Sequence, residues 1–441
     1  MNLTGIELCP GGTLYVIPKD TFKTDFLMIG FTVPLARETV SRYAMLPAVL
    51  CRGSARYPTL ESLAMRLDSL YNAGIGGRSH KCGEAQQVSF QLRCLEQEVV
   101  PPEDDGEPLF DALLDTFCEV LFSPLTEDGA FLAPYVEGEK KNLCESIRAK
   151  INHKTSYAMS RLEEEMCAGE VWGIPGRGSE EDVAAVTPQN LYEAYTDMLA
   201  YAPVSLYYVG KKSAGEVMQS LAPFVHRLSA YRREPLYAPV TQVIRRAEHP
   251  VREVCEDMDA KQSKLCIGYR TDAVLSDGDF YRFALFNELL GGCASSKLFL
   301  EVRERRGLCY FCTSYPEAQK GLLYIACGIN ADDREEAEGA IYAQIDAICS
   351  GDISDEEFRA AKKSLISGYR EIEDSAASLA VWYANRHAAG IGTSPEETAQ
   401  QVAACTKQQL SECAARITRD TVYFLHGTAV GGGDEEDAYD E

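Results

Sequence analysis

The residues best suited to chemistry are an arginine and a tyrosine in SSKLFLEVRERRGLCYFCTSY, the segment that begins at Ser295. Its pattern predicts a helix to about Arg306, a C-cap at Gly307 and a strand thereafter. Arg303 would then lie in the last helical turn and Tyr310 early in the strand. A guanidinium and a phenol brought together at such a corner can donate hydrogen bonds to a peptide carbonyl. The alternative is a cationic helix end favoured by the helix dipole, followed by an ordinary strand tyrosine.

Other motifs that carry chemistry are missing. The chain has no G-x-S-x-G, no Walker loop and no G-x-G-x-x-G. None of its six histidines lies within four residues of another, so no helical histidine pair can chelate zinc. Taken singly, each predicts a surface or packed side chain rather than a ligand. These residues are His80, His153, His226, His249, His387 and His426.

The cysteines predict a reducing compartment. Sixteen are scattered through the chain, often within apolar runs, as is typical of buried thiols in a cytosolic protein. One CxxC pair occurs, Cys309 and Cys312. We expect a strand there, and residues three apart in a regular strand point to opposite faces. The pair is therefore expected to have no metal or redox role.

Bulk properties exclude several classes of protein. With 441 residues, two or more domains are expected. The formal net charge of −24 argues against binding nucleic acid or anionic lipid, since both require a basic surface. The amino-terminal residues lack the pattern of a secretory signal, and the longest apolar run is too short to span a membrane. We expect a soluble, cytoplasmic protein.

Two similar halves are expected to position the chemistry. TPQNLYEAYTDMLAYAPVSLYYVG and TKQQLSECAARITRDTVYFLHG both predict a capped helix and then a hydrophobic strand closed by glycine. Thr187 and Thr406 suit the N-cap, and Pro188 suits the first helical position. Strand and helix runs mix without strict alternation, which predicts an α+β fold.

The expected division of the chain is a first half at 1–231, a linker at 232–262, a second half at 263–430 and a disordered acidic tail at 431–441. Long amphipathic helices are expected at about 137–167 and 355–389. AQQVSFQLRCL, in the first half, is a candidate sheet edge that could accept a peptide as an added strand. The alternative for this run is ordinary core sheet.

LGGCASSKLFLEVRERRGLCYFCTSY resembles the C-terminal-half signature of the pitrilysin/insulinase family of zinc peptidases, which includes the mitochondrial processing peptidases. The likeness extends over nearly the whole chain, including its duplication. It implies two homologous α/β-roll halves that face each other across a chamber. It also implies that Arg303 and Tyr310 bind substrate near a zinc ion held by a first half, of the same chain or of a partner.

The first half departs from the family pattern H-x-x-E-H. Aligned on Gly53 and Ser54, both histidine positions are alanine, Ala44 and Ala48, and the position of the catalytic glutamate is Pro47. The third ligand position falls on Ser146, with Glu145 one residue away. Alanine and proline side chains cannot bind zinc. The resemblance therefore implies a catalytically silent member without a metal or other cofactor.

Within the family, the run from Phe31 to Ala73 is most similar to the non-catalytic members of bacterial two-gene pairs, which are associated with 5-aminopentanol modification of elongation factor P. This likeness implies a heterodimer with a zinc-bearing H-x-x-E-H homologue, acting on a peptide or small protein. One alternative is a purely structural homologue that binds no peptide. The other is an active zinc peptidase with ligands that the pattern does not reveal.

Overall fold

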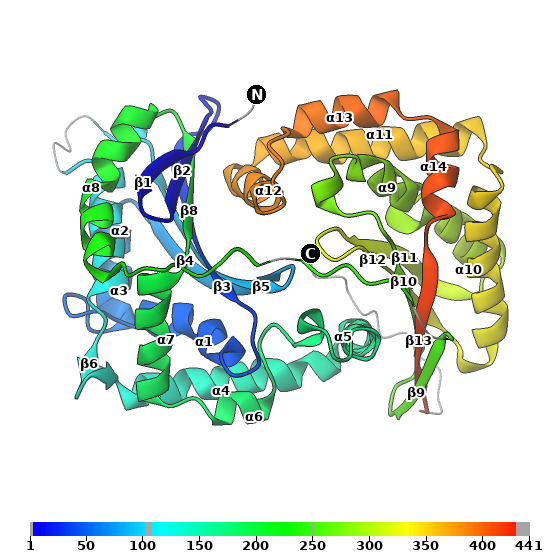
Figure 1. Ribbon diagram of the computed structural model, residues 1–441, viewed down its shortest axis with the longest axis horizontal. Coiled ribbons are helices and arrows are strands. Elements are labelled where there is room, and N and C mark those ends of the chain that lie inside the picture. Colours follow the sequence, from blue (N-terminus) through cyan, green and yellow to red (C-terminus); the bar gives the residue numbers. More distant parts are fainter. Residues whose placement is uncertain (1–2, 102–106, 241, 248–249, 429–441) are drawn as a thin grey trace. The chain divides into compact units, whose positions relative to one another are not determined.

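The computed structural model describes residues 3–101, 107–240, 242–247 and 250–428. The chain forms two compact units, each assembled from segments that are distant in sequence (Figure 1). The first unit comprises Met1–Ile147, Ile174–Thr241 and Glu373–Ala388. The second comprises Arg148–Gly173, Gln242–Ile372 and Ala389–Glu441. The tail expected at 431–441 lies outside the described residues.

The first unit is built on a six-stranded sheet of order β1-β2-β8-β3-β5-β4. Its strands are β1 (Ile6–Cys9), β2 (Gly12–Pro18), β3 (Thr24–Pro34), β4 (Gly74–Cys82), β5 (Ala85–Leu95) and β8 (Val204–Gly210). β2 and β8 are parallel and the other neighbours are antiparallel. AQQVSFQLRCL is β5, which pairs with β3 on one side and β4 on the other. The candidate edge is therefore wrong and the alternative, ordinary core sheet, is confirmed; β4 is the terminal strand.

Helices cover both faces of this sheet. One face packs on the core that includes α1, α3, α7 and α8, and the other receives α12 against β8 and β3. The helices of the unit are α1 (Val40–Cys51), α2 (Leu60–Ser69), α3 (Leu109–Phe122), α4 (Ala133–Ala149), α6 (Glu180–Ala184), α7 (Pro188–Tyr201), α8 (Ala214–Tyr231) and α12 (Ala376–Ala388). A two-stranded hairpin, β6 (Thr126–Glu127) and β7 (Ala130–Phe131), completes it.

The second unit repeats this plan on a five-stranded sheet of order β11-β12-β10-β13-β9. Its strands are β9 (Arg252–Met258), β10 (Ser263–Arg270), β11 (Cys309–Glu317), β12 (Leu322–Ile329) and β13 (Thr418–Gly427). Its helices are α5 (Lys154–Met166), α9 (Phe280–Asn287), α10 (Arg334–Cys349), α11 (Asp355–Glu371), α13 (Pro395–Ala404) and α14 (Lys407–Ala414), with π-helical segments η5 (Glu288–Gly292) and η6 (Leu298–Arg305).

The two sheets correspond strand by strand. The order β2-β8-β3-β5-β4 matches β9-β13-β10-β12-β11, and each series begins with its one parallel pair. The α+β fold with two similar halves is therefore confirmed. β9 lies inside the segment expected as a linker, at 232–262. The boundaries expected for the halves follow the order of the sequence and stay a prediction.

Each half contributes one helix to the other unit. The single helix expected at about 137–167 is wrong, because α4 ends at Ala149 and a 3-10 turn at Lys150–Asn152 precedes α5. α5 packs on β10 and β13 of the second unit. The helix expected at 355–389 is likewise two helices, α11 and α12, separated by a 3-10 turn at Ile372–Asp374. The amphipathic pattern continues through both breaks and does not indicate which sheet each helix covers.

Helix caps follow the sequence closely. Thr187 and Thr406 are both N-caps, and each side chain accepts a hydrogen bond from the backbone three residues on, at Asn190 and Gln409. Both helices have reciprocal capping boxes, which satisfy two otherwise unpaired backbone donors. Gly11, in the turn between β1 and β2, has φ +69°, a conformation that glycine adopts without strain. The N-caps predicted at Thr187 and Thr406 are confirmed.

Candidate functional site

The corner between η6 and β11 has the predicted form. η6 ends at Arg305, and the Gly307 amide donates to the carbonyl of Arg303 at 3.0 Å. The Leu308 amide donates to the carbonyl of Val302 at 3.1 Å. Gly307 has φ +65° and leads the chain into β11. Arg303 is thus in the last turn and Tyr310 is the second residue of the strand.

Both side chains at this corner reach solvent. The Arg303 side chain is 42% exposed, with its guanidinium carbon 4.8 Å from the centroid of the Phe299 ring and its Nε 3.6 Å from Glu304 Oε1. Stacking on an aromatic ring orients a guanidinium without consuming its hydrogen-bond donors. Tyr310 is 57% exposed, which is unusual for a tyrosine. The corner therefore presents donors on two side chains to a ligand.

A β-bulge explains why Tyr310 points outward. Cys309 is opposite Ile329 and Phe311 is opposite Gly328, so Tyr310 is an extra residue in the ladder. A bulged residue is left unpaired and its side chain is redirected. β11 is also the terminal strand of its sheet, so its outer edge carries backbone groups that no strand of the sheet pairs.

The bulge also corrects the expectation for the CxxC pair. Because one extra residue lies between them, Cys309 and Cys312 are both buried in the same hydrophobic cluster rather than on opposite faces. Cys327, on β12, is directly opposite Cys312. Side chains three residues apart point to opposite faces only in a regular strand, and the bulge at Tyr310 makes β11 irregular.

α1 carries the residues that match the family's H-x-x-E-H positions. Ala48 is exposed, Ala44 is half-buried and Pro47 is buried. Pro47 packs against β4 so closely that a Cβ built on Gly77 would be 2.7 Å from the Pro47 Cβ. This face of α1 therefore presents two methyl groups and a pyrrolidine ring beside the terminal strand of the sheet.

α4 carries the matching third position, Ser146. The Ser146 hydroxyl accepts a hydrogen bond from Arg177 Nη1 at 2.6 Å, and the carbonyl of Arg177 accepts one from Ser41 Oγ on α1 at 3.0 Å. Glu139 lies about two turns before Ser146 on the same helix. It forms an ion pair with Arg52 and accepts a hydrogen bond from Asn142 Nδ2 at 3.1 Å. The place of Arg177 could not be predicted from the sequence, because it is 31 residues from Ser146 and 136 residues from Ser41.

These residues do not fit a zinc ion. The donor set is one hydroxyl, already bonded to a cationic guanidinium, and zinc requires imidazole, thiolate or carboxylate ligands. Among the residues that the structure describes, no group of three or more His, Cys, Asp or Glu side chains is arranged to hold a metal. A fixed positive charge at Arg177 further disfavours a cation beside Ser146.

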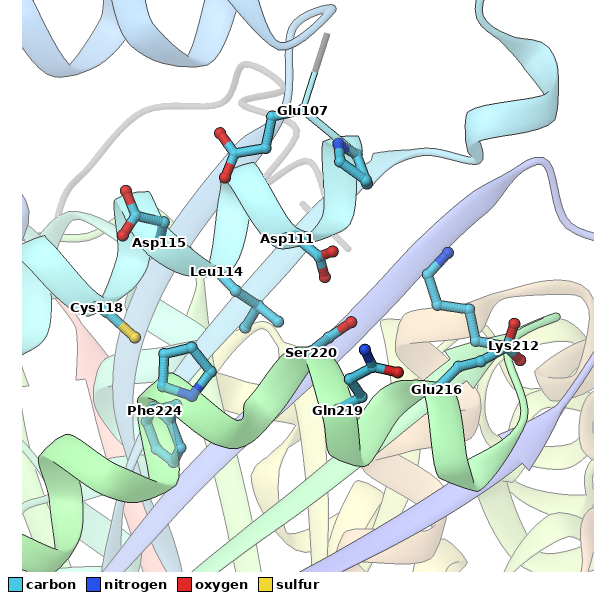
Figure 2. A pocket seen from close by; sticks show the side chains of 12 residues that line it. Glu107, Asp111, Leu114, Asp115, Cys118, Lys212, Glu216, Gln219, Ser220 and Phe224 are labelled. Atoms are coloured by element: carbon cyan, nitrogen blue, oxygen red, sulfur yellow. The ribbon is translucent and has the colours of Figure 1, made fainter. Parts of the chain in front are cut away.

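A cavity in the first unit is lined by other residues. It has a volume of about 490 Å³ and is bounded by α3 and α8 (Figure 2). Asp111, Asp115 and Glu216 line it, with Leu114 and Phe224 as apolar lining. Lys212, also in the lining, forms an ion pair at 3.0 Å with the buried Asp25. The cavity contains none of the residues matched to the family's site.

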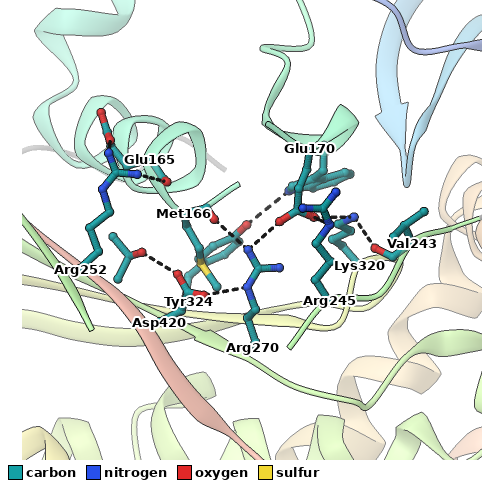
Figure 3. A network of polar contacts seen from close by, with 12 residues as sticks. Glu165, Met166, Glu170, Val243, Arg245, Arg252, Arg270, Lys320, Tyr324 and Asp420 are labelled. Atoms are coloured by element: carbon teal, nitrogen blue, oxygen red, sulfur yellow. Dashed lines mark hydrogen bonds and ion pairs between the residues drawn. The ribbon is translucent and has the colours of Figure 1, made fainter. Parts of the chain in front are cut away.

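A buried charge network holds α5 and the loop after it on the second sheet (Figure 3). Glu170 accepts hydrogen bonds from Arg270 Nη2 at 2.6 Å, and its other oxygen is 2.9 Å from Lys320 Nζ. Arg270 Nε also donates to Asp420 at 2.7 Å. Burial alone would raise the pKa of Glu170, but the hydrogen bonds from Lys320 and Arg270 outweigh it and hold that pKa below its usual value. These groups are matched in charge and serve the packing of the unit.

Comparison with known proteins gives a consistent result. Residues 185–365 match the family model described as the peptidase M16 inactive domain. The chain is 31% identical over 418 residues to the probable inactive metalloprotease YmfF of Bacillus subtilis, covering 95% of this chain and 96% of that protein. It is 26% identical over 124 residues to the uncharacterized zinc protease YmxG of the same organism, covering 28% of this chain and 30% of that protein.

Solved structures agree on the fold. A conserved protein from Enterococcus faecalis V583 superposes with a TM-score of 0.88 at 25% identity, covering 98% of this chain and all of that chain. A peptidase M16 inactive domain from Pseudomonas fluorescens superposes with a TM-score of 0.76 at 16% identity, with the same coverage. No helix within the described ranges has the length and apolar character needed to cross a bilayer.

Proposed function

Because the chain belongs to the M16 peptidase family, as an inactive member, we propose that it binds peptide on behalf of a zinc-bearing homologue. One observation carries the proposal. The metal-binding side chains are replaced at Ala44, Ala48 and Ser146, whereas the arginine and tyrosine of the second half are kept in exposed positions. Arg303 and Tyr310 lie together at the corner between η6 and β11, where both side chains can reach one ligand.

The peptide would bind along the edge of β11. An extended segment can add to a terminal strand through backbone hydrogen bonds, with nearby side chains fixing its register. Arg303 would donate to a peptide carbonyl, and the Tyr310 hydroxyl to the same or a neighbouring oxygen. β4 provides a second terminal strand in the first unit, beside α1.

The catalytic chemistry would belong to a partner with an intact H-x-x-E-H motif. In such a motif two histidines hold zinc and the glutamate activates the attacking water. This chain would supply binding and orientation, and would be inactive alone. We place the pair in the cytoplasm, acting on a peptide or small protein, with a role in 5-aminopentanol modification of elongation factor P.

Mixing the two purified chains tests this proposal. We expect no cleavage of a peptide library by this chain alone, and cleavage by the mixture well above that of the partner alone. Loss of a charge-assisted hydrogen bond costs about 1.5–3 kcal/mol, so Arg303→Ala should lower kcat/KM of the mixture about 10- to 100-fold. Tyr310→Phe should lower it about 2- to 10-fold, because a neutral hydrogen bond contributes less.

Matched controls separate binding from folding. Arg305 is in the same helical turn and Tyr315 on the same strand, and both are exposed. Arg305→Ala and Tyr315→Phe should leave kcat/KM within about twofold. If Arg303→Ala and Tyr310→Phe also leave the mixture fully active, the chain is a structural subunit. Stoichiometric zinc in the isolated chain would instead indicate an active peptidase and contradict the proposal.

The link to elongation factor P has its own test. Deleting the gene in its host should leave elongation factor P without the 5-aminopentanol adduct, as measured by intact-protein mass spectrometry. An unchanged adduct would remove this role and leave the peptide-binding proposal standing.

A further inference from the structure

Three cysteines gather on the buried face of the second sheet. Cys312 on β11 and Cys327 on β12 are paired directly across the two strands. The bulge at Tyr310 brings Cys309 onto the same face, and all three belong to one hydrophobic cluster. Cys309 is opposite Ile329, the second residue after Cys327 on β12, so the three cysteines are neighbours on this face. No other part of the site uses these side chains.

The thiol of Cys309 differs from the other buried thiols of the chain. Burial raises the pKa of Cys118 and of Cys266 to about 12, which keeps those thiols protonated and inert. At Cys309, the neighbouring Cys312 and Cys327 thiols lower the pKa below its usual value against the effect of burial, and the charge of Arg303 lowers it further. A lowered pKa favours the thiolate, which is the nucleophilic form of cysteine.

Solvent exposure also distinguishes Cys309 from the other two cysteines. Cys309 is 8% exposed, whereas Cys312 is 1% exposed and Cys327 is fully buried. Cys309 also directly precedes the exposed Tyr310, at the β-bulge in the terminal strand. A small solute would reach Cys309 first, and then the two more deeply buried thiols on the same face.

We propose that Cys309, Cys312 and Cys327 form an oxidisable thiol site that reacts with hydroperoxides and closes to a disulfide. The Cys309 thiolate attacks the terminal oxygen of the hydroperoxide and the O–O bond breaks. The alkoxide leaves, takes a proton and becomes an alcohol, and Cys309 becomes a sulfenic acid. The Cys312 or Cys327 sulfur then attacks the Cys309 sulfur, and hydroxide leaves with the thiol proton as water. Two thiols and one hydroperoxide thus give one disulfide, one alcohol and one water.

Peroxide titration of the reduced, full-length chain tests the site without a partner or peptide, so its result is independent of the proposed function. We expect the loss of two of the sixteen thiols at low hydrogen peroxide, restored by dithiothreitol. After alkylation and non-reducing digestion, mass spectrometry should find a disulfide from Cys309 to Cys312 or Cys327. While hydrogen peroxide is limiting, the exposed Cys255 and Cys349 should remain reduced until this disulfide has formed.

Variants identify the attacking sulfur. Cys309→Ser should abolish the disulfide, and Cys312→Ser combined with Cys327→Ser should leave a sulfenic acid at Cys309 that dimedone traps. Cys266→Ser, which removes a buried thiol from a neighbouring strand, should oxidise like the parent chain. The proposal is overturned if the parent chain loses Cys255 and Cys349 first with the three thiols intact. A disulfide between Cys312 and Cys327 alone would likewise overturn it, and both outcomes are read from the unmodified chain.

Discussion

Replacing Glu170 by glutamine should destabilise the second unit more than any change of one exposed charge. Glu170 lies in a chain segment that precedes the second half in sequence, yet it bonds to Arg270 and Lys320 of the second half. The Glu170 side chain is 3% exposed and that of Lys320 is fully buried. Glutamine keeps the shape and can still accept hydrogen bonds, but it removes the negative charge.

The magnitude follows from the charge balance. Two carboxylates, Glu170 and Asp420, face two buried cations, Arg270 and Lys320. Without Glu170, Asp420 still pairs with Arg270 at 2.7 Å, whereas the buried Lys320 loses the carboxylate that lies 2.9 Å from its Nζ. Removing one partner of a buried ion pair costs about 3–5 kcal/mol. For a unit of this size, that corresponds to a melting-temperature decrease of roughly 6–20 °C.

Urea denaturation followed by intrinsic fluorescence measures this loss, because Trp172, two residues after Glu170, is buried in the hydrophobic cluster of the second unit. Glu165→Gln is the matched control, since Glu165 is a glutamate on α5 with a partly exposed ion pair to Arg252. That control should cost less than about 1 kcal/mol. Glu170→Gln combined with Lys320→Met restores neutrality and should recover part of the loss. A Glu170→Gln cost equal to that of Glu165→Gln would refute the buried-charge reasoning.

The remaining predictions concern pH dependence and local backbone structure. The pKa of Glu170 is held low in the folded chain. Its contribution to the unfolding free energy is therefore complete above the unfolded pKa of about 4.3 and is lost as pH falls through the folded pKa. An acid titration of the unfolding free energy should show this loss in the parent chain and not in Glu170→Gln. Burial lowers the pKa of His387, and it lowers that of His80 in the same unit to about 4, so the unfolding free energy of the first unit should fall as pH drops below about 6.5. His387→Gln should reduce that slope in urea titrations from pH 5 to 8, and His387→Gln combined with His80→Gln should reduce it further. Gly307→Ala should lower the unfolding free energy by about 1–2 kcal/mol in the same assay, because an alanine at φ +65° is strained. Steric contact does not contribute, since a Cβ at this position would meet no atom within 4 Å. Thr406→Ala should cost about 1 kcal/mol by loss of the N-cap, and Thr406→Ser should restore most of it.

What could be predicted from the sequence was local. The caps at Thr187 and Thr406 and the glycine turn at Gly307 depend on residues a few positions apart, and a single sequence contains that information. The Arg303–Tyr310 corner was placed correctly for the same reason. The duplication was visible because both halves repeat one series of elements.

What could not be predicted was non-local. Nothing in the amphipathic pattern of 137–167 marks the passage of the chain from one unit to the other. The Tyr310 bulge adds one residue to a strand whose composition is ordinary, so the shared face of Cys309 and Cys312 was missed. The contacts of Arg177 with Ser146 and of Glu170 with Lys320 join residues far apart in sequence, for which spacing carries no signal.

The exchange of α5 and α12 sets the order in which the nascent chain can fold. The first unit requires Glu373–Ala388, so its sheet stays uncovered on one face until most of the protein has left the ribosome. Cleavage within 232–262 would give two fragments, each carrying a helix that belongs to the other. Neither fragment could complete its unit alone, and together they should reassemble by complementation, as two swapped subunits do. Each half of the sequence therefore needs a helix of the other half to complete its folded unit.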